Sequence, residues 1–345
     1  MKRCKRCILP ETYAGLTFDN EGICNYCKAW KDPQYEGEGK LIELIKSRRA
    51  NSKYDCAIGF SGGRDSTYLL YYASKILKLK VIAFTIDNGF MSKEAIRNVY
   101  NIVQKMQVDH VIQSHDYLQK AFPKNIRTWL KKPDPAMLIA LCNGCRYGYS
   151  KGIYQLMKKH DCNVYLDGNN PFELNPYKTK LLSMKPSSNS KIYLFFGAMA
   201  HIFRNLAWVT KPYNAYIFYS DFMSYIGKKY KKKMEKEGML YISPFLNYIK
   251  WEEKNMEYVL DKELNWENKD RGTSSWRTDC QIAPLKLHLC KKSLDYSDKD
   301  ALFSALIRDK QISREEALAR IDNDNRTSLK DINEFLKKFD LSIDE

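Results

Sequence analysis

Four short apolar runs alternate with longer, helix-patterned segments in the first half of the chain, and this alternation constrains the fold more than any other feature. The runs cover residues 54–60, 80–89, 109–114 and 163–169. Each has the length of a buried strand, and the first three are followed by segments with helical spacing. Strands that alternate with helices form a parallel, doubly wound sheet, which binds its ligands at the carboxyl ends of the strands. The sequence therefore predicts an α/β protein with such a sheet.

The segments between the runs have the apolar spacing of helices. The first segment places five residues on one face: Leu69, Tyr72, Ala73, Ile76 and Leu77. The second begins at Ser92, a residue type that caps helices, and its expected inward residues are Ile96, Val99, Tyr100 and Val103. The third is expected to be helical from about residue 116 to about residue 159, with a break near Pro133.

The stretch Ser61–Ser66, with the sequence SGGRDS, lies at the first strand-to-helix turn, where sheets of this kind bind phosphates. Gly62 and Gly63 lack side chains, so backbone N–H groups can approach an anion, and the helix N-terminus adds a favourable dipole. Ser61 and Ser66 can donate further hydrogen bonds. The stretch matches neither the Walker A pattern nor GxGxxG, so those two kinds of nucleotide site are set aside. The alternative is that the glycines only make a tight turn.

Ten cysteines in a chain without a visible N-terminal signal sequence favour metal or redox chemistry over a disulfide framework. Cys4 with Cys7 and Cys24 with Cys27 form two CxxC pairs, and the sixteen residues between the pairs are typical of zinc knuckles. Four thiolates can close a tetrahedral zinc site, which suits a structural role. The segment is too small for a core of its own, so zinc would substitute for one. Redox or disulfide chemistry at these four cysteines is the alternative.

Composition divides the chain into three expected units: a zinc-ribbon knuckle in residues 1–35, the α/β domain in residues 36–180, and a mainly helical region in residues 181–345. The last region is expected to cover the substrate, and its C-terminal helices to serve as packing elements. The net charge of +16 attracts nucleic acid, anionic lipid or small anions without choosing among them. The lysine-rich run 228–237 is expected to be a solvated helix, with a tRNA-binding face as the alternative. No N-terminal signal sequence is visible, so we expect a cytoplasmic protein. The longest apolar run, residues 192–203, is too short to span a membrane.

The SGGRDS stretch resembles the SGGxDS signature of the PP-loop ATP pyrophosphatases. This resemblance implies that the loop binds the pyrophosphate portion of ATP. It implies that the enzyme adenylates a carbonyl or amide oxygen with release of pyrophosphate, and that a nitrogen or sulfur nucleophile then displaces AMP. Mg²⁺ between the phosphates would be held with the help of Asp65. The loop residues expected to contact ATP are Ser61, Gly62, Gly63, Asp65 and Ser66. The stretch FTIDNG at the end of the second run lies where the second strand of this family contacts adenine and ribose, so the resemblance also implies contacts by Thr85 and Asp87.

Further polar residues are expected at the same edge of the sheet. Gly168 and Asn169 lie at the end of the fourth run and are candidates for nucleotide binding, and Glu173 is a candidate Mg²⁺ ligand. The alternative is that this segment only forms a turn, because its residue types favour turns. Arg64 and Arg146 are candidate partners for phosphate charge. Arg146 directly follows the motif CNGC. Asp65 and Arg146 are the predicted catalytic residues.

The layout of the whole chain is similar to that of the N-acetyl sugar amidotransferases of surface-polysaccharide (lipopolysaccharide) and nonulosonic-acid biosynthesis. The matching stretches cover nearly the full length and are CKRC…CNYC, GFSGGRDS, CNGCRYG, LDGNN, WRTDC and LIRDKQISREEALARI. The resemblance implies that the acetamido oxygen of an N-acetylated sugar is adenylated and that ammonia then displaces AMP to give an acetamidino group. It also implies a separate glutaminase and an ammonia-channelling protein as partners.

A third CxxC pair, Cys142 with Cys145, could be joined in space by Cys280. This two-plus-one pattern is similar to that of PP-loop enzymes that thiolate tRNA and bind a [4Fe–4S] cluster with one open iron. A second metal site of another kind, and reduced thiols with only a packing role, are the alternatives. A tRNA sulfurtransferase is therefore the second functional hypothesis. The third is a zinc-ribbon protein that binds nucleic acid without turnover.

Overall fold

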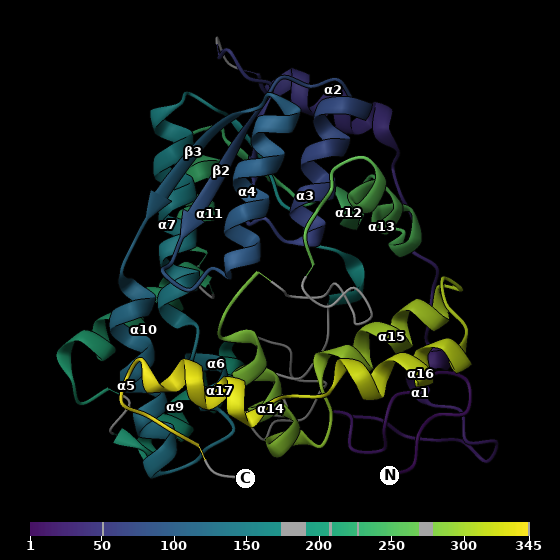
Figure 1. Ribbon diagram of the computed structural model, residues 1–345, viewed down its shortest axis with the longest axis vertical. Coiled ribbons are helices and arrows are strands. Elements are labelled where there is room, and N and C mark those ends of the chain that lie inside the picture. The colour runs from purple at the N-terminus through teal and green to yellow at the C-terminus, as the bar shows by residue number, and fades with distance from the viewer. Residues whose placement is uncertain (50–51, 174–190, 207–208, 226–227, 269–278, 344–345) are drawn as a thin grey trace.

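The structure is a computed structural model that describes all residues except 50–51, 174–190, 207–208, 226–227, 269–278 and 344–345. Its centre is a sheet of five parallel strands in the order β3-β2-β1-β4-β5 (Figure 1). The strands are β1 (Cys56–Gly59), β2 (Val81–Asp87), β3 (Asp109–Ser114), β4 (Val164–Leu166) and β5 (Leu240–Ile242). The predicted parallel α/β fold and its four predicted strands are confirmed. The sequence does not predict β5, because this short strand lies in a region with mainly helical patterns, outside the alternation of strands and helices that reveals the equally short β4.

Helices cover both faces of this sheet (Figure 1). Cys56 and Ile58 of β1 pack into one hydrophobic cluster, whereas Ala57 between them packs into another. Because side chains alternate between the two faces of a strand, a run that is apolar at every position is buried on both faces. The helices of the first face are α2 (Glu38–Arg48), α3 (Arg64–Tyr71), α4 (Lys93–Met106) and α13 (Glu253–Lys262). The helices of the second face are α7 (Asn143–Lys159) and α11 (Lys229–Lys236).

Most of the remaining helices lie beyond the arrowheads of the strands, in the lower half of Figure 1. They are α1 (Asn25–Lys28), α5 (Tyr117–Lys131), α6 (Met137–Ala140), α9 (Lys191–Arg204), α10 (Pro212–Tyr225), α14 (Ala283–Leu294), α15 (Asp298–Arg308), α16 (Arg314–Asp324) and α17 (Leu329–Lys337). The short helix α12 (Pro244–Asn247) lies beside α13. Phe122, Met137 and Leu285 are fully buried members of the hydrophobic cluster that many of these helices share. The carboxyl ends of the strands therefore face a second layer of structure rather than open solvent.

Two predicted helix faces are partly wrong. After α3 the chain forms a π-helical turn over Tyr72–Ile76, and the wider turn leaves the Ile76 side chain 47% exposed. On α4, Ile96 and Tyr100 are exposed. The buried residues of α4 are instead Ala95, Asn98, Val99, Ile102 and Met106. Asn98 points inward because its amide donates a hydrogen bond to the SGGRDS loop. A polar residue that is buried in this way cannot be found from the spacing of apolar residues.

Residues 1–35 pack against the C-terminal helices, and α1 lies beside α16 in Figure 1. The backbone N–H of Ile8 donates to Ser304 Oγ on α15 at 3.3 Å. The guanidinium of Arg314 on α16 donates to the carbonyl oxygen of Cys7 at 3.1 Å. The N-terminal module is therefore joined to the end of the chain. The division into three units stays a prediction, and β5 extends the sheet with residues from beyond the predicted end of the α/β unit.

Two further observations concern the apolar parts of the chain. No helix among the described residues is long and apolar enough to cross a membrane. His201, which lies in the longest apolar run, is 5% exposed, and its Nδ1 lies 2.9 Å from Asp134 Oδ2. It is a core histidine with a polar partner.

Candidate functional site

The candidate site is a cleft at the carboxyl ends of β1 and β4. The strand order runs toward β2 on one side of β1 and toward β4 on the other, so the cleft lies where the order reverses. Open α/β sheets bind ligands at this point. The cleft has a volume of about 770 Å³ and extends from the SGGRDS loop to residues of α14, α15, α16 and α17. Its position is the one expected from the alternation of strands and helices.

The centre of the SGGRDS loop has a backbone shape that requires glycine. Gly62 has a φ of +74°, and a Cβ there would lie 2.3 Å from the carbonyl oxygen of Ala95 on α4. The Gly62 carbonyl accepts hydrogen bonds from the indole of Trp266 at 2.8 Å and from the amide of Asn98 at 3.3 Å. The loop is therefore packed directly on α4, with no room for a side chain between them.

The two serines of the loop stabilise it internally. Ser66 Oγ donates to the carbonyl of Gly63 at 3.1 Å and accepts from the N–H of Ser61 at 3.2 Å. Gly63 is the N-cap residue of α3, and no side chain of the described residues caps this helix. The N-terminus of α3 adjoins the cleft at this loop, and helix N-termini favour the binding of anions.

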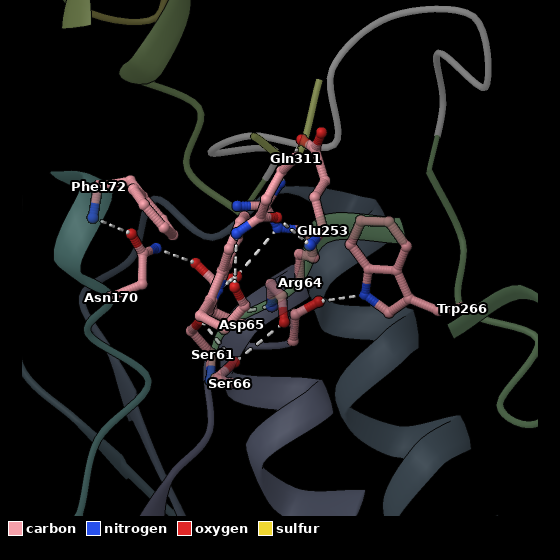
Figure 2. Close-up of polar contacts among 12 residues, drawn as sticks. Ser61, Arg64, Asp65, Ser66, Asn170, Phe172, Glu253, Trp266 and Gln311 are labelled. Atoms are coloured by element: carbon pink, nitrogen blue, oxygen red, sulfur yellow. Dashed lines mark hydrogen bonds and ion pairs between the residues drawn. The ribbon is translucent and has the colours of Figure 1, made fainter. Parts of the chain in front are cut away.

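Asp65 lines the cleft and is oriented by three donors (Figure 2). Its Oδ1 accepts from Arg64 Nε at 3.0 Å and from the indole of Trp251 at 3.1 Å, and its Oδ2 accepts from the amide of Asn170 at 3.0 Å. A carboxylate has about four lone-pair positions, so these three bonds from described residues leave one for a ligand. A fixed carboxylate beside an anion-binding loop is a suitable ligand for a hard divalent cation.

Arg64 is among the residues that line the cleft, but its side chain is buried behind the loop. It is 2% exposed, lies over the ring of Trp251 at 4.8 Å, and has its Nη1 3.5 Å from Glu253 Oε1. Burial alone would lower the pKa of this guanidinium, but the carboxylates of Asp65 and Glu253 outweigh burial and raise the pKa. These ion pairs lie inside the protein and give no support to a phosphate contact by Arg64, which stays a prediction.

The segment after β4 forms the opposite wall of the cleft. Asp167 accepts hydrogen bonds from the backbone and side-chain nitrogens of Asn169 at 3.0 and 2.6 Å, and burial raises the pKa of its carboxyl. Gly168 approaches the loop closely, since a Cβ there would lie 3.0 Å from the carbonyl carbon of Asp65. The structure thus brings Gly168 and Asn169 to the cleft beside the loop. The side chain of Glu173 lies outside the described residues, so its predicted role stays a prediction.

Thr85 and Asp87 of β2 are not among the described residues that line this cleft. The hydroxyl of Thr85 donates to the carbonyl of Phe60 at 2.6 Å and lies 2.8 Å from Nε2 of His110, and the residue is 1% exposed. This position gives no support to a nucleotide contact by the Thr85 side chain. Asp87 lines a neighbouring pocket of about 510 Å³ together with His115, and its role stays a prediction.

Arg146 is also not among the described residues that line the cleft, although the neighbouring Cys145 is. Its guanidinium pairs with Asp221 on α10, with Nε 3.1 Å from Oδ1, and donates to the carbonyl of Ile139 at 2.9 Å. These contacts join α7 to α10. They give no support to the predicted catalytic role of Arg146, which stays a prediction.

Cys142, Cys145 and Cys280 all line the cleft. The amide of Asn88 lies 3.0 Å from Cys145 Sγ, and a bridge between Met91 and Cys280 holds the third cysteine against the segment after β2. Burial raises the pKa of the Cys145 thiol to about 11 and also raises that of Cys280. Metal-ligating atoms of His, Cys, Asp and Glu side chains gather within 4.8 Å of one another, in a group of three or more, only at the N-terminal cysteines among the described residues. The three cleft thiols therefore lack the spacing for a single ion, which disfavours a second zinc site.

The four N-terminal cysteines form a closed site that fits one metal ion. All four are buried, and their sulfur atoms lie within 4.8 Å of one another. The Sγ atoms of Cys4 and Cys27 are 3.9 Å apart, and those of Cys7 and Cys24 are 3.8 Å apart. A tetrahedron with metal–sulfur bonds of about 2.3 Å has edges of about 3.8 Å. Hydrogen bonds from Cys24 and Cys27, with a further contribution from Arg308, lower the pKa of the Cys7 thiol, so the group favours a thiolate.

Several residues beside the loop carry no local signal in the sequence: Asn98, Trp251, Glu253 and Trp266. Tertiary packing alone brings them to the loop. Asp279 is different, because it lies in the motif WRTDC, which also contains Cys280. Its carboxylate lies over the loop, since a Cβ on Gly63 would be 3.2 Å from Asp279 Oδ2.

Comparison with curated proteins finds one partial relative. No protein-family model matches the chain. An uncharacterised protein of Methanocaldococcus jannaschii is 32% identical over 120 residues, which are 33% of this chain and 43% of that protein. The chain thus matches less than half of the length of this relative.

Three solved structures are similar in fold. The NH₃-dependent NAD synthetase of Campylobacter jejuni, in complex with nitrate, is 15% identical and covers 59% of this chain and 96% of its own, with a TM-score of 0.29. The NMN synthetase of Francisella tularensis is 13% identical and covers 60% and 96%, with a TM-score of 0.30. The U34-tRNA thiolase NcsA of Methanococcus maripaludis, with its [4Fe–4S] cluster, is 12% identical and covers 98% of both chains, with a TM-score of 0.32. The similarity at these scores carries no argument about what this chain binds. Its class, a parallel α/β protein with a glycine-rich loop where the strand order reverses, rests on the strand order and loop geometry above.

Proposed function

We propose that the chain is an AMP-forming, ATP-dependent enzyme of the PP-loop type that converts the acetamido group of an N-acetylated sugar into an acetamidino group. The observation that carries this proposal is the SGGRDS loop at the end of β1, with the N-terminus of α3 behind it and the oriented Asp65 carboxylate beside it. These features suit the pyrophosphate of ATP, because backbone amides and a helix dipole can meet phosphate oxygens while the carboxylate meets a cation.

The reaction requires the amide oxygen of the sugar to meet the α-phosphorus of ATP. A bond forms between these two atoms while the bond to pyrophosphate breaks. The amide carbon then carries a good leaving group. Ammonia attacks this carbon, the carbon–oxygen bond breaks, and AMP leaves with the former amide oxygen, while one proton is released and an amidine remains. The chain contributes alignment of the reacting atoms and stabilisation of phosphate charge.

Two carboxylates beside the loop would hold Mg²⁺, namely Asp65 and Asp279. Mg²⁺, when bound with the nucleotide, neutralises negative charge on the phosphates. Without a cation, the Asp279 carboxylate over Gly63 would repel a phosphate at this position. We assign zinc to the four N-terminal cysteines, because a closed tetrahedral set of thiolates is typical of structural zinc. None of these four cysteines is among the described residues that line the cleft.

The residues that line the far end of the cleft support a polar molecule as the substrate that ATP adenylates. Its lining from α14 to α17 includes Lys286, Asp298, Arg326 and Asp331. Among the described residues of this end, none is aromatic. Proteins that select single-stranded nucleotides commonly stack the bases on aromatic side chains. A mixture of donors and acceptors instead suits the hydroxyl groups of a sugar.

We expect ammonia to reach this enzyme from a separate glutaminase through an ammonia-channelling partner. The purified chain is therefore expected to use ammonium salts but not glutamine. Glutamine-dependent turnover by the pure chain would contradict this expectation.

A tRNA sulfurtransferase is the second candidate, and the three cysteines that face the cleft favour it. A [4Fe–4S] cluster held by three cysteines supplies, when bound, one open iron that can hold sulfur. Cysteines that ligate different irons need not crowd as closely as the ligands of one ion. A wider spacing of Cys142, Cys145 and Cys280 than that of a single-ion site is therefore no argument against this group.

Pyrophosphate release from an anaerobic preparation separates the two candidates. ATP and ammonium are supplied with either an acetamido sugar or unmodified tRNA, and iron and zinc are measured in the same sample. Sugar-dependent release with one zinc and little iron supports the amidotransferase. Release that depends on tRNA, with about four irons per chain, supports the sulfurtransferase instead.

A glycine variant ties the activity to the loop. Gly62→Ala should abolish pyrophosphate release, because the added methyl group would meet the Ala95 carbonyl at 2.3 Å. Gly238→Ala is the matched control, since Gly238 also has a positive φ, +78°, but an added Cβ meets no described atom within 4 Å. Equal activity of the two variants would show that the loop does not bind the reacting nucleotide.

A further inference from the structure

We propose that Glu253 and Arg320 are positioning residues for the SGGRDS loop. They hold Arg64, and through it Asp65, in the orientation that ATP binding requires. This inference rests on the proposed ATP-dependent function and assigns part of it to helices far away in the sequence.

Four charged side chains of alternating sign connect α16 to the loop, and Figure 2 labels three of them, namely Glu253, Arg64 and Asp65. Arg320 on α16 donates to both oxygens of Glu253, from Nη1 to Oε2 at 2.8 Å and from Nη2 to Oε1 at 3.0 Å. Glu253 Oε1 in turn lies 3.5 Å from Arg64 Nη1, and Arg64 Nε donates to Asp65 Oδ1 at 3.0 Å. Glu253 therefore lies between two arginines, and each of its partners is fixed by another contact.

Because these charges are buried, each of them needs its partner in the network. The side chains of Arg64 and Glu253 are both 2% exposed, and that of Arg320 is 24% exposed. The carboxylates of Asp65 and Glu253 compensate the charges of the two arginines, and Arg320 also pairs with Glu316. When one member of a buried set of charges is removed, the partners are left without compensation and must change position or recruit water. Loss of the Glu253 charge would therefore release Arg64 from its place behind the loop.

A second set of contacts leads to the same carboxylate oxygen. Gln311 accepts from the backbone N–H of Glu253 at 3.0 Å and donates to the carbonyl of Trp251 at 2.8 Å. The indole of Trp251 donates to Asp65 Oδ1 at 3.1 Å. Oδ1 is thus bound by both Arg64 and Trp251, which leaves Oδ2 for Asn170 and for a ligand in the cleft. The segment that contains Trp251 and Glu253 sets which oxygen of Asp65 faces the cleft.

The helix α16 is well placed to hold this network. Arg320 lies over the ring of Phe303 on α15 at 4.6 Å, so its guanidinium has a fixed support. Arg314 on the same helix donates to the carbonyl of Cys7 in the N-terminal module. The helix α16, which was expected from its sequence to serve only in packing, therefore contacts both the N-terminal module and the charged side chains behind the loop.

The test is the affinity for a non-hydrolysable ATP analogue with Mg²⁺, measured by calorimetry without any acceptor. Arg320→Met and Glu253→Gln should each weaken binding on the order of tenfold, and Arg320→Lys should restore part of the loss. Arg3→Met is the matched control, because the Arg3–Asp300 pair has side-chain exposures of 21% and 1%, close to the 24% and 2% of the Arg320–Glu253 pair. The control should lower the unfolding temperature to a similar extent but keep the ATP affinity within about twofold.

Each outcome separates this inference from the proposed function. If Arg320→Met weakens binding no more than Arg3→Met while the wild type binds the analogue, the positioning role is overturned and the ATP site stands. If the wild type does not bind the analogue, both are overturned. Should Arg320→Met fail to fold, Glu253→Gln, which keeps the side-chain volume, carries the same comparison with the control.

Discussion

The N-terminal metal module and the cleft both use CxxC pairs, but they place them in opposite surroundings. The sulfur atoms of Cys4, Cys7, Cys24 and Cys27 are buried and lie within 4.8 Å of one another. Cys142 and Cys145 face a cleft of about 770 Å³ that also contains the SGGRDS loop, and they do not gather with Cys280 at the distance of a single ion.

This difference shows that the spacing of cysteines along the chain does not by itself define their chemistry. Both groups start from the same local motif, yet the first closes around one ion position and leaves no open coordination site. The second lies where a ligand can enter. We expect loss of a module cysteine to affect folding, and loss of a cleft residue to affect binding and turnover.

The largest expected effect is that of Cys24→Ser. Removal of one of four thiolates leaves the metal site incomplete, and the module has too little core to replace it, so the free energy of unfolding should fall by about 3 kcal/mol or more. Thermal unfolding and zinc content measure the effect. Cys162→Ser, at another buried cysteine, should keep the zinc. A Cys24→Ser protein with normal zinc content and an unchanged unfolding temperature would contradict the account.

A smaller loss of stability, but a complete loss of nucleotide binding, is expected for Gly62→Ala. Positive φ and the approach to the Ala95 carbonyl should cost about 2 kcal/mol. Calorimetry with the ATP analogue measures binding, and denaturant unfolding measures stability. A variant that binds the analogue normally would show that the cleft, unlike the metal module, tolerates a change of backbone shape.

For Cys145→Ser we expect a change in the free energy of unfolding within about 1 kcal/mol and no loss of zinc, because this thiol is not part of the closed site. Binding of the ATP analogue should also be unchanged. Iron content before and after the substitution is the informative measurement: iron that is lost with Cys145 would favour the sulfurtransferase. A loss of zinc would instead break the distinction between the two cysteine groups.

The smallest effect concerns the pH dependence of stability through Asp167. Burial raises its pKa in the folded protein above the unfolded value, so the folded state holds the proton more tightly. The stability that this proton confers is full below the unfolded pKa and is lost as the pH rises through the folded pKa. Asp167→Asn cannot ionise, so its stability relative to the wild type should rise by less than about 1 kcal/mol between about pH 3 and about pH 8. A difference that stays flat with pH would show that the folded pKa is not raised.

Much of the fold and part of the site follow from local patterns in the sequence. The strand before the SGGRDS loop, the helix after it and the spacing of the first four cysteines each need only a few neighbouring residues to be recognised. The direction of the Arg64 side chain could not be predicted in this way, because the carboxylate that draws it inward, Glu253, lies 189 residues further along the chain. For the same reason Trp251 and Asn98 carry no sign of their contacts with the loop. The strand β5 was not predicted because it lies in a mainly helical region, whereas the equally short β4 belongs to an apolar run that continues the alternation of strands and helices.

The most direct test of the central claim follows the amide oxygen itself. An acetamido sugar labelled with ¹⁸O in its acetamido group is incubated with ATP, Mg²⁺, ammonium and the purified chain, and the AMP is examined by mass spectrometry. Attack of the amide oxygen on the α-phosphorus predicts one ¹⁸O in each AMP released and none in the amidine product. AMP without the label, or an absence of AMP in the presence of sugar and ammonium, would contradict the account.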